Sequence, residues 1–265
     1  MHAFEYHRPA SAKEAVDLLS KKDEARFLAG GQSLVQAMKL RLTSPSDLID
    51  LGTIKDLTGI KTSGSAVEIG AMTRHAEVAG SAEVKKAIRS LAAMAELIGD
   101  RQVRHMGTIG GSLANNDPAA DYPAGVLGLG ATIVTNKRKI AADDFFKGIY
   151  ETALGKSEII TQVSFPIPKR AAYMKFKNPA SRYAIVGVFV ADFGSGVRVA
   201  VTGAGPCAFR VAQMEKALAA KFAPESVADI KIPEKGLNSD LHAKADYRAH
   251  LITVMARRAV EAAIK

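Results

Sequence analysis

Short apolar runs and helical patterns alternate along the chain and predict its elements. An apolar or β-branched run bounded by turn residues predicts a strand, and apolar residues three and four positions apart predict an amphipathic helix. Strands are therefore expected at 27–28, 48–51, 59–60, 66–69, 131–135 and 158–165. Helices are expected after a Ser11/Glu14 capping box, at 35–40, at 74–79 with Thr73 as cap, from Ser81 to Ala95, and at 124–129.

The organisation changes after Pro166 and Pro168, which together with Lys169 and Arg170 indicate a linker. Beyond it the pattern predicts three antiparallel strands, at 173–176, 184–193 and 197–202, and helices at 211–221 and 246–264. We therefore expect an α+β protein of two domains. The first would span 1–168, in two parts of about 1–58 and 59–168, and a smaller C-terminal domain would span 171–265.

Two glycine-rich stretches carry the candidate chemistry. The first, Ala29-Gly30-Gly31-Gln32-Ser33-Leu34, joins an apolar run to a helical pattern, and a strand, glycine turn and helix present backbone amides to an anion. The second lies within 98–121, where apolar periodicity is absent and Gly107, Gly110 and Gly111 alternate with small polar residues. Either stretch alone is explained equally well as a surface loop, but two could hold one diphosphate from two sides. Asp117 and Asp121 add acceptors for a ribose hydroxyl.

The composition changes this picture little but restricts the partners. Hydrophobic residues make up 48% of the chain and charged residues 24%, as in a globular protein, and no apolar run is long enough to span a membrane. Residues 1–6 lack a signal-peptide pattern, so a cytoplasmic location is expected. The net charge of +9 comes from dispersed residues with little aromatic interleaving, which indicates a solvated basic surface, or one that meets acidic partner subunits or an anionic cofactor, rather than nucleic acid.

Other common chemistries are not indicated. A Gly-x-Gly-x-x-Gly fingerprint is missing, and Gly155-Lys156-Ser157 lacks the upstream glycine of a P-loop because Tyr150 stands there. The six histidines show no metal-ligand spacing, and the single cysteine, Cys207, excludes an iron–sulfur cluster held by this chain alone. No nucleophile or general base stands in a catalytic constellation, so a bound cofactor would have to carry the chemistry.

Taken together, these motifs resemble those of the FAD-binding medium subunits of molybdenum hydroxylases, the xanthine dehydrogenase family, and above all the carbon monoxide dehydrogenase medium chains. The resemblance rests on residues 29–33, on Thr108-Ile109-Gly110-Gly111-Ser112 with Asp121 downstream, and on Tyr173-Met174-Lys175-Phe176. Residues 4–9 and 247–251 match the bacterial pattern as well, so the resemblance covers essentially the whole chain. It implies a two-part FAD-binding domain of the PCMH type, followed by a smaller C-terminal domain.

The resemblance also implies which residues would contact FAD. The two glycine motifs would bind the diphosphate through backbone amides, and Asp121 would form a hydrogen bond with the cofactor. For Ile98 and Ile160, core packing is an equally good explanation as contact with FAD. For Lys175 the alternative is a solvated lysine on a strand. Tyr183 resembles only loosely the residue that covers the isoalloxazine ring in this family. The implied cofactor-binding residues are Leu28, Ala29, Gly30, Gly31, Gln32, Ser33, Leu34, Ile98, Thr108, Ile109, Gly110, Gly111, Ser112, Asn115, Asp121, Ile160 and Lys175. No catalytic or metal-binding residue is implied.

By the same resemblance, partners carry the rest of the electron path. A large subunit would hold the molybdopterin centre and a small subunit two [2Fe–2S] clusters, in a dimer of heterotrimers. Non-covalent FAD on this chain would pass the electrons to an external acceptor. The overall resemblance favours carbon monoxide as the substrate of the complex, with an N-heterocycle or an aldehyde as the alternative. Some members carry a histidine where this chain has Gln32, and this departure leaves the specificity for carbon monoxide open. The alternatives are a flavin-free assembly subunit, which the intact glycines disfavour, and a self-sufficient flavin oxidase, which the missing acid–base constellation disfavours.

Overall fold

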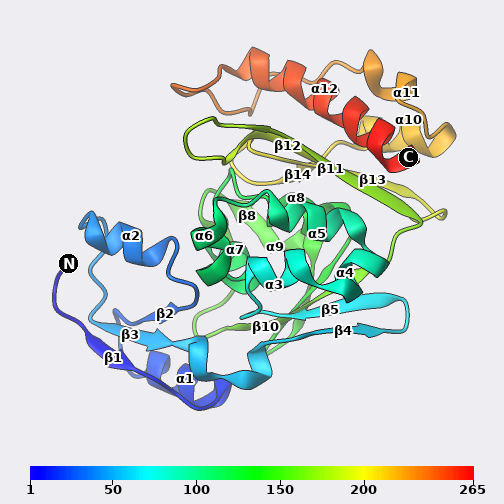
Figure 1. Cartoon of the computed structure of the whole chain (residues 1–265). Helices are drawn as coiled ribbons and strands as arrows, with labels where there is room; N and C mark the ends of the chain where they lie inside the picture. Colours follow the sequence, from blue (N-terminus) through cyan, green and yellow to red (C-terminus); the bar gives the residue numbers. More distant parts are fainter.

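A small sheet of three parallel strands begins the fold in the computed structural model, which describes residues 1–265 (Figure 1). β3 (Asp47–Asp50) lies between β1 (Glu5–His7) and β2 (Arg26–Leu28). α1 (Ala12–Ser20) begins after Ser11, whose hydroxyl accepts the Glu14 N–H, as the capping box predicts. α2 (Leu34–Lys39) follows β2 through the first glycine motif. Two 3₁₀ turns, Leu51–Thr53 and Lys55–Leu57, lead to the next sheet.

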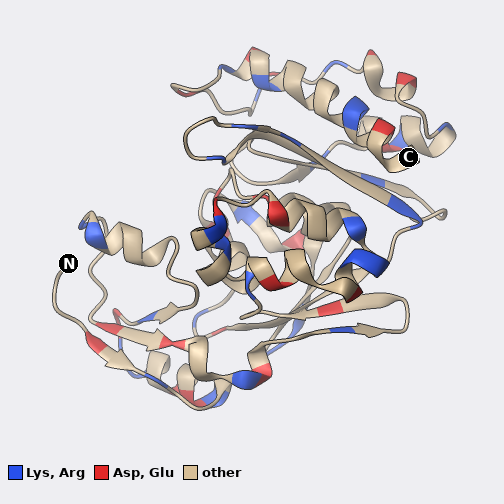
Figure 2. Ribbon diagram, viewed as in Figure 1, with Lys and Arg blue, Asp and Glu red and all other residues tan.

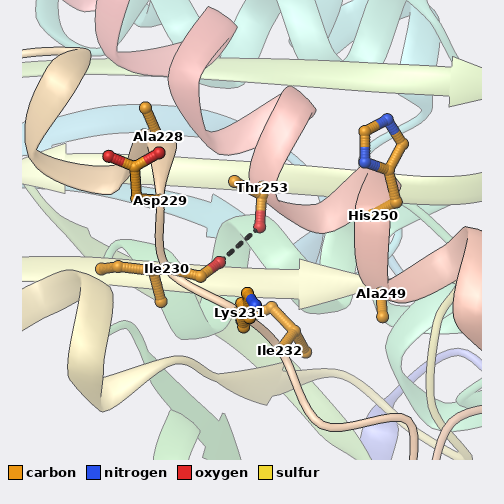
Figure 3. Close-up of a pocket in the computed structure, with 8 residues that line it drawn as sticks. All are labelled: Ala228, Asp229, Ile230, Lys231, Ile232, Ala249, His250 and Thr253. Atoms are coloured by element: carbon orange, nitrogen blue, oxygen red, sulfur yellow. Dashed lines mark hydrogen bonds between the residues drawn. The ribbon is translucent and has the colours of Figure 1, made fainter.

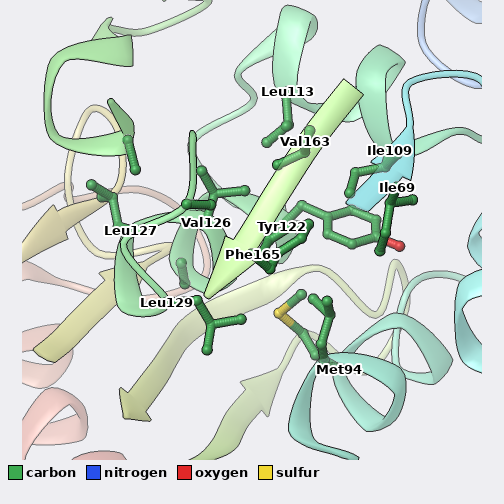
Figure 4. Packing of buried hydrophobic residues seen from close by; sticks show 14 of the residues in the cluster. Ile69, Met94, Ile109, Leu113, Tyr122, Val126, Leu127, Leu129, Val163 and Phe165 are labelled. Carbon is green, nitrogen blue, oxygen red and sulfur yellow. The ribbon is translucent and has the colours of Figure 1, made fainter. Parts of the chain in front are cut away.

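The central sheet has five antiparallel strands, and alternate residues of its inner strands point into the main core. Val67, Ile69, Ile133, Val163 and Phe165 are fully buried there, and Figure 4 shows three of them packed against Ile109, Leu113 and Tyr122 from the helices. This alternation places the helices on one face of the sheet. The strands, in spatial order, are β4 (Ile60–Ser63), β5 (Ala66–Gly70), β10 (Ile160–Pro166), β6 (Thr132–Thr135) and β7 (Lys139–Ala141).

The helices of this unit lie between the central sheet and the C-terminal sheet (Figure 1). In chain order they are α3 (His75–Gly80), α4 (Ala82–Ala87), α5 (Arg89–Glu96), α6 (Arg101–Met106), α7 (Ile109–Asn115), α8 (Tyr122–Gly128) and α9 (Ala142–Phe145). A two-stranded ribbon of β8 (Phe146–Gly148) and β9 (Glu151–Thr152) follows α9.

Three sequence-based expectations about these helices are wrong. Arg74, not Thr73, precedes α3 as its cap, because the Thr73 hydroxyl is buried and lies 3.1 Å from both Gly59 N and Gly59 O. The helix expected from Ser81 to Ala95 breaks at Ile88, whose backbone (φ −139°, ψ 72°) redirects the chain so that both α4 and α5 bury apolar residues. Residues 98–121 are not one long loop, since they contain α6 and α7.

The C-terminal sheet has four antiparallel strands and helices on its outer face. β12 (Ala184–Asp192) is buried at all nine positions, because α5 and α8 cover one face of the sheet and α12 covers the other. The expected linker shrinks to residues 167–169, since β10 ends at Pro166 and the next strand begins at Arg170. The remaining elements are β11 (Arg170–Lys177), β13 (Val197–Thr202), the unexpected β14 (Phe209–Arg210), α10 (Ala212–Ala220), α11 (Glu225–Ala228) and α12 (Ala245–Ile264).

Candidate functional site

The first glycine motif is an irregular turn whose backbone amides are open. Residues 29–33 lie between β2 and α2 in no helix or strand, and Gly31 has a φ of 71°, which favours glycine. The backbone N–H groups of residues 30–33 donate to no other group of the chain. Successive open amides in a turn form a concavity that suits phosphate oxygens. A turn of this kind can receive the oxygens of a diphosphate.

The second glycine motif is the first turn of α7, and its amides are already used. The Ile109 N–H donates to Thr73 O at 3.1 Å, the Gly110 N–H donates to Ala71 O at 2.8 Å, and the Gly111 N–H donates to the Thr108 hydroxyl at 3.1 Å. This differs from the expectation that both motifs offer amides. The second motif instead offers side chains, because the half-buried Ser112 and Asn115 stand at helical spacing on one face of α7 while Ile109 and Leu113 enter the core.

The two motifs touch, and their glycines make the contact possible. A Cβ on Gly30 would lie 2.3 Å from Met106 O, and a Cβ on Gly111 would lie 3.3 Å from the Ala29 Cβ. Gly110 has a different role, since its Cβ would lie 2.6 Å from the Ala71 Cβ beneath α7. Two of these glycines thus bring the motifs together, and the third seats α7 on its neighbours. We call the residues 29–33 and 108–115 the glycine site.

Asp121 lies at the start of α8 in a buried polar cluster with two residues of β11. Its Oδ1 accepts the Tyr173 hydroxyl at 2.5 Å and its Oδ2 accepts Lys175 Nζ at 3.0 Å. Lys175 Nζ also donates to Leu97 O at 2.8 Å. The side chains of Asp121 and Lys175 are only 4% and 2% exposed, so the solvated-lysine alternative for Lys175 does not hold. Burial raises the pKa of Asp121, and Lys175 and Tyr173 oppose that rise.

The other implied residues divide between site and core. Leu28 and Leu34 flank the first motif and are half-buried. Ile98 is partly buried against the main core. Its carbonyl accepts a hydrogen bond from Arg104 Nη1 at 2.9 Å. Ile160 is buried within β10 as part of that core, which supports the packing role for this residue.

A second polar group lies beyond the end of α7 and includes Asp117, the other acceptor that the sequence indicated for a ribose hydroxyl. Asn116 is fully buried with a φ of 44°, and its Nδ2 donates to Gly148 O and Glu151 O at 2.8 and 2.7 Å. These bonds hold the β8–β9 turn, where Tyr150 has a φ of 55° and donates through its hydroxyl to Asp117 Oδ2 at 3.2 Å. Burial, Asp117 and Tyr150 raise the pKa of Tyr183 to about 12. Strained backbone often gathers at functional sites.

Other parts of the molecule offer no competing chemistry. Figure 3 shows a pocket between the 228–232 segment and α12, lined by residues such as Lys231 and His250, where the Thr253 hydroxyl donates to Ile230 O at 2.8 Å. It lies on the outer helical layer, across the C-terminal sheet from the glycine site.

No group of three His, Cys, Asp or Glu residues could hold a metal ion, and no helix is long and apolar enough to cross a membrane. Figure 2 shows both signs of charge spread along the elements.

A family model described as the FAD binding domain in molybdopterin dehydrogenase matches residues 2–168. The chain belongs to this family. It is 38% identical to the nicotine 6-hydroxylase medium subunit of Paenarthrobacter nicotinovorans, over 97% of this chain and 96% of that protein. It is also 38% identical to the carbon monoxide dehydrogenase medium chain of Hydrogenophaga pseudoflava, over 98% of this chain and 96% of that protein.

The likeness extends to three dimensions. The reconstituted carbon monoxide dehydrogenase from Oligotropha carboxidovorans contains a chain that matches this one with a TM-score of 0.90 at 35% identity, over 99% of this chain and 98% of that chain. This FAD-binding subunit is therefore an α+β oxidoreductase subunit of the molybdenum hydroxylase type, as the glycine motifs indicated.

Proposed function

We propose that this subunit binds FAD non-covalently at the glycine site and passes electrons from iron–sulfur clusters of a partner to an external acceptor. The observation that carries the proposal is the run of open amides in the first motif, which packs against the start of α7 at Ala29 and Gly111. Successive backbone N–H groups of this kind form concavities that bind anions such as a diphosphate.

The residues present fit the cofactor at two further points. Each carboxylate oxygen of Asp121 has two lone pairs and receives one donor, and Lys175 has three N–H groups of which two are used. Two acceptor positions on Asp121 and one donor on Lys175 are thus left for FAD beside the first turn of α8. Together with the glycine site, the residues that would hold FAD are Leu28, Leu34, Ile98, Asn115, Asp121 and Lys175, with Ile160 supporting them from the core.

FAD supplies the redox chemistry when bound, because it can accept and release electrons that no side chain of this subunit can carry. The chain binds and orients it. A covalent link is not supported, because residue 32 is glutamine and Cys207 lies between β13 and β14, where burial raises the pKa of its thiol.

The partners follow from the relatives, which are medium subunits or medium chains of larger enzymes. We propose a large molybdopterin subunit and a small [2Fe–2S] subunit, assembled as a dimer of heterotrimers. Carbon monoxide is the substrate that the carbon monoxide dehydrogenase relatives suggest, and an N-heterocycle is the one that the nicotine hydroxylase suggests. An aldehyde is suggested by the glyceraldehyde dehydrogenase medium chain, 35% identical, of Sulfolobus acidocaldarius.

The test is an absorption spectrum and mass analysis of the native complex purified through this chain. Flavin and iron–sulfur bands with a large and a small partner chain are expected, and absence of flavin from the assembled complex would contradict the proposal. Gly111→Val should remove the flavin, because the new side chain meets Ala29 and Thr108, whereas Gly196→Val has open space around it and should retain flavin. Assembly without flavin in the wild type would support the assembly-subunit alternative instead.

A further inference from the structure

Asp121 takes both of its donors from one strand. Tyr173 and Lys175 are two residues apart on β11, so their side chains lie on the same face of the sheet. Asp121 comes from the other side of the contact, at the start of α8. The carboxylate is therefore shared between the FAD-binding region and the C-terminal sheet, and its orientation depends on both.

The sheet leaves space for the Tyr173 phenol. Gly187 lies on the neighbouring strand β12, opposite Lys175, and a Cβ there would lie 2.1 Å from Tyr173 Oη. Phe189, which pairs with Tyr173 across the strands, stacks on its ring with centroids 6.1 Å apart. The Tyr173 phenol thus lies over Gly187 and against the Phe189 ring, and its hydroxyl points to Asp121.

Few neighbouring groups determine whether the Asp121 side chain is ionised. Burial favours the neutral acid, while the Lys175 ammonium and the Tyr173 hydroxyl favour the carboxylate. The other titratable groups that face Asp121 are Tyr122 and Tyr183, and both are neutral phenols. Loss of the Tyr173 hydroxyl would leave Lys175 alone to oppose burial. If Asp121 then took a proton, Lys175 would lose its counter-charge and its orientation.

We propose that Tyr173 is a positioning residue of the flavin site, which keeps Asp121 ionised against Lys175 so that FAD binding does not vary with pH near neutrality. Tyr173 need not touch FAD for this role, because it acts through Asp121. The inference rests on the proposed function, since it requires FAD to bind beside Asp121 and Lys175.

The test compares FAD affinity across pH in four full-length chains: wild type, Tyr173→Phe, Asp121→Asn and the double variant. Flavin fluorescence titration of the deflavinated chains between about pH 5.5 and 8.5 gives the dissociation constants. Wild type should change less than about twofold, and Tyr173→Phe should bind about tenfold more weakly at the acid end, because each pH unit below a pKa costs a factor of ten. The double variant should bind weakly at every pH.

A pH-independent Tyr173→Phe profile would overturn the proposal, and so would a pH dependence that persists in the double variant. Gly187→Ala provides a second approach, because it displaces the phenol without removing it and should reproduce the pH dependence. Infrared spectra of the deflavinated chains separate this inference from the proposed function. In difference spectra taken against the double variant, the protonated carboxyl band of Asp121 should appear on acidification earlier in Tyr173→Phe than in wild type. If wild type binds no FAD, the proposed function fails while this band still decides the role of Tyr173.

Discussion

Glycines that look alike in the sequence have different physical roles in the structure. Gly31 adopts a positive φ that opens the first turn, Gly30 allows one motif to touch the other, and Gly110 seats α7 against Ala71. The sequence indicates that such positions need glycine, but it does not say whether the absent side chain makes room for a ligand or for the protein itself. That distinction requires the neighbouring backbone, which comes from distant parts of the chain.

Gly110→Ala tests the packing role. The added methyl would overlap Ala71, so we expect the free energy of unfolding to fall by about 1–3 kcal/mol, as in other overpacked cores. Gly80→Ala is the matched control, because nothing lies near its Cβ position in α3, and alanine there should be neutral or stabilise by about 0.4–1 kcal/mol. Urea unfolding followed by circular dichroism measures both. Equal stability of Gly110→Ala and wild type would contradict the packing role.

At the scale of elements, strands with strong patterns were predicted well and helices poor in apolar residues were not. β5, β10 and β12 stand where alternation or apolar runs predict them. α7 was missed because its core face has only Ile109 and Leu113, and glycine at its second and third positions has low helix propensity. β14 has two residues and leaves almost no pattern to detect.

An ion pair between the buried Glu158 carboxylate and the exposed Arg138 side chain makes the β6–β7 region sensitive to acid. Arg138 Nε and Glu158 Oε1 are 3.0 Å apart, and this bond, with Gly155 N–H and the Thr135 hydroxyl, lowers the pKa of Glu158 from 4.5 to about 2. A lowered carboxyl pKa stabilises the fold above the unfolded pKa, and that contribution disappears as the pH falls from about 4.5 towards 2.

Arg138→Met should therefore be less stable than wild type at pH 7, with the difference narrowing below about pH 4.5. Thermal unfolding at a series of pH values measures this. Lys137→Met serves as the control, because Lys137 Nζ contacts only the Lys156 carbonyl and leaves Glu158 untouched. A constant difference between Arg138→Met and wild type across the whole pH series would show that Glu158 does not titrate with Arg138.

At the scale of the whole molecule, the region before residue 168 and the region after it share one core. Phe189 and Ala191 of β12 belong to the main core, while Val188 and Val190 of the same strand belong to the core under α12. The sequence predicts strands on both sides of residue 168, but it does not show that the single strand β12 contributes side chains to two cores. Nor could it show that Asp121 bonds to Tyr173, 52 residues later, because such a contact leaves no local pattern.

We expect the chain to unfold in one transition because of this shared strand. Calorimetric and van't Hoff enthalpies should agree, as for a cooperative unit. Phe189→Leu, on the inner face, and Val188→Ala, on the outer face, should each lower the midpoint of that single transition. Two separate transitions, each lowered by only one of these substitutions, would show that the two regions unfold independently.

The segment from Asn116 to Asp121 has consequences for how this sequence can drift in evolution. Asn116 donates hydrogen bonds to the β8–β9 turn, and Asp121 accepts one from Tyr173 of β11. Between them, the Ala120 carbonyl accepts the Thr202 hydroxyl at 2.6 Å and the Pro118 carbonyl accepts the Gly203 N–H at 2.8 Å. A substitution here would therefore affect both the β8–β9 turn and the C-terminal sheet. Compensating changes would have to arise in two distant parts of the gene together, so we expect these six positions to vary more slowly among relatives than the exposed residues beside them.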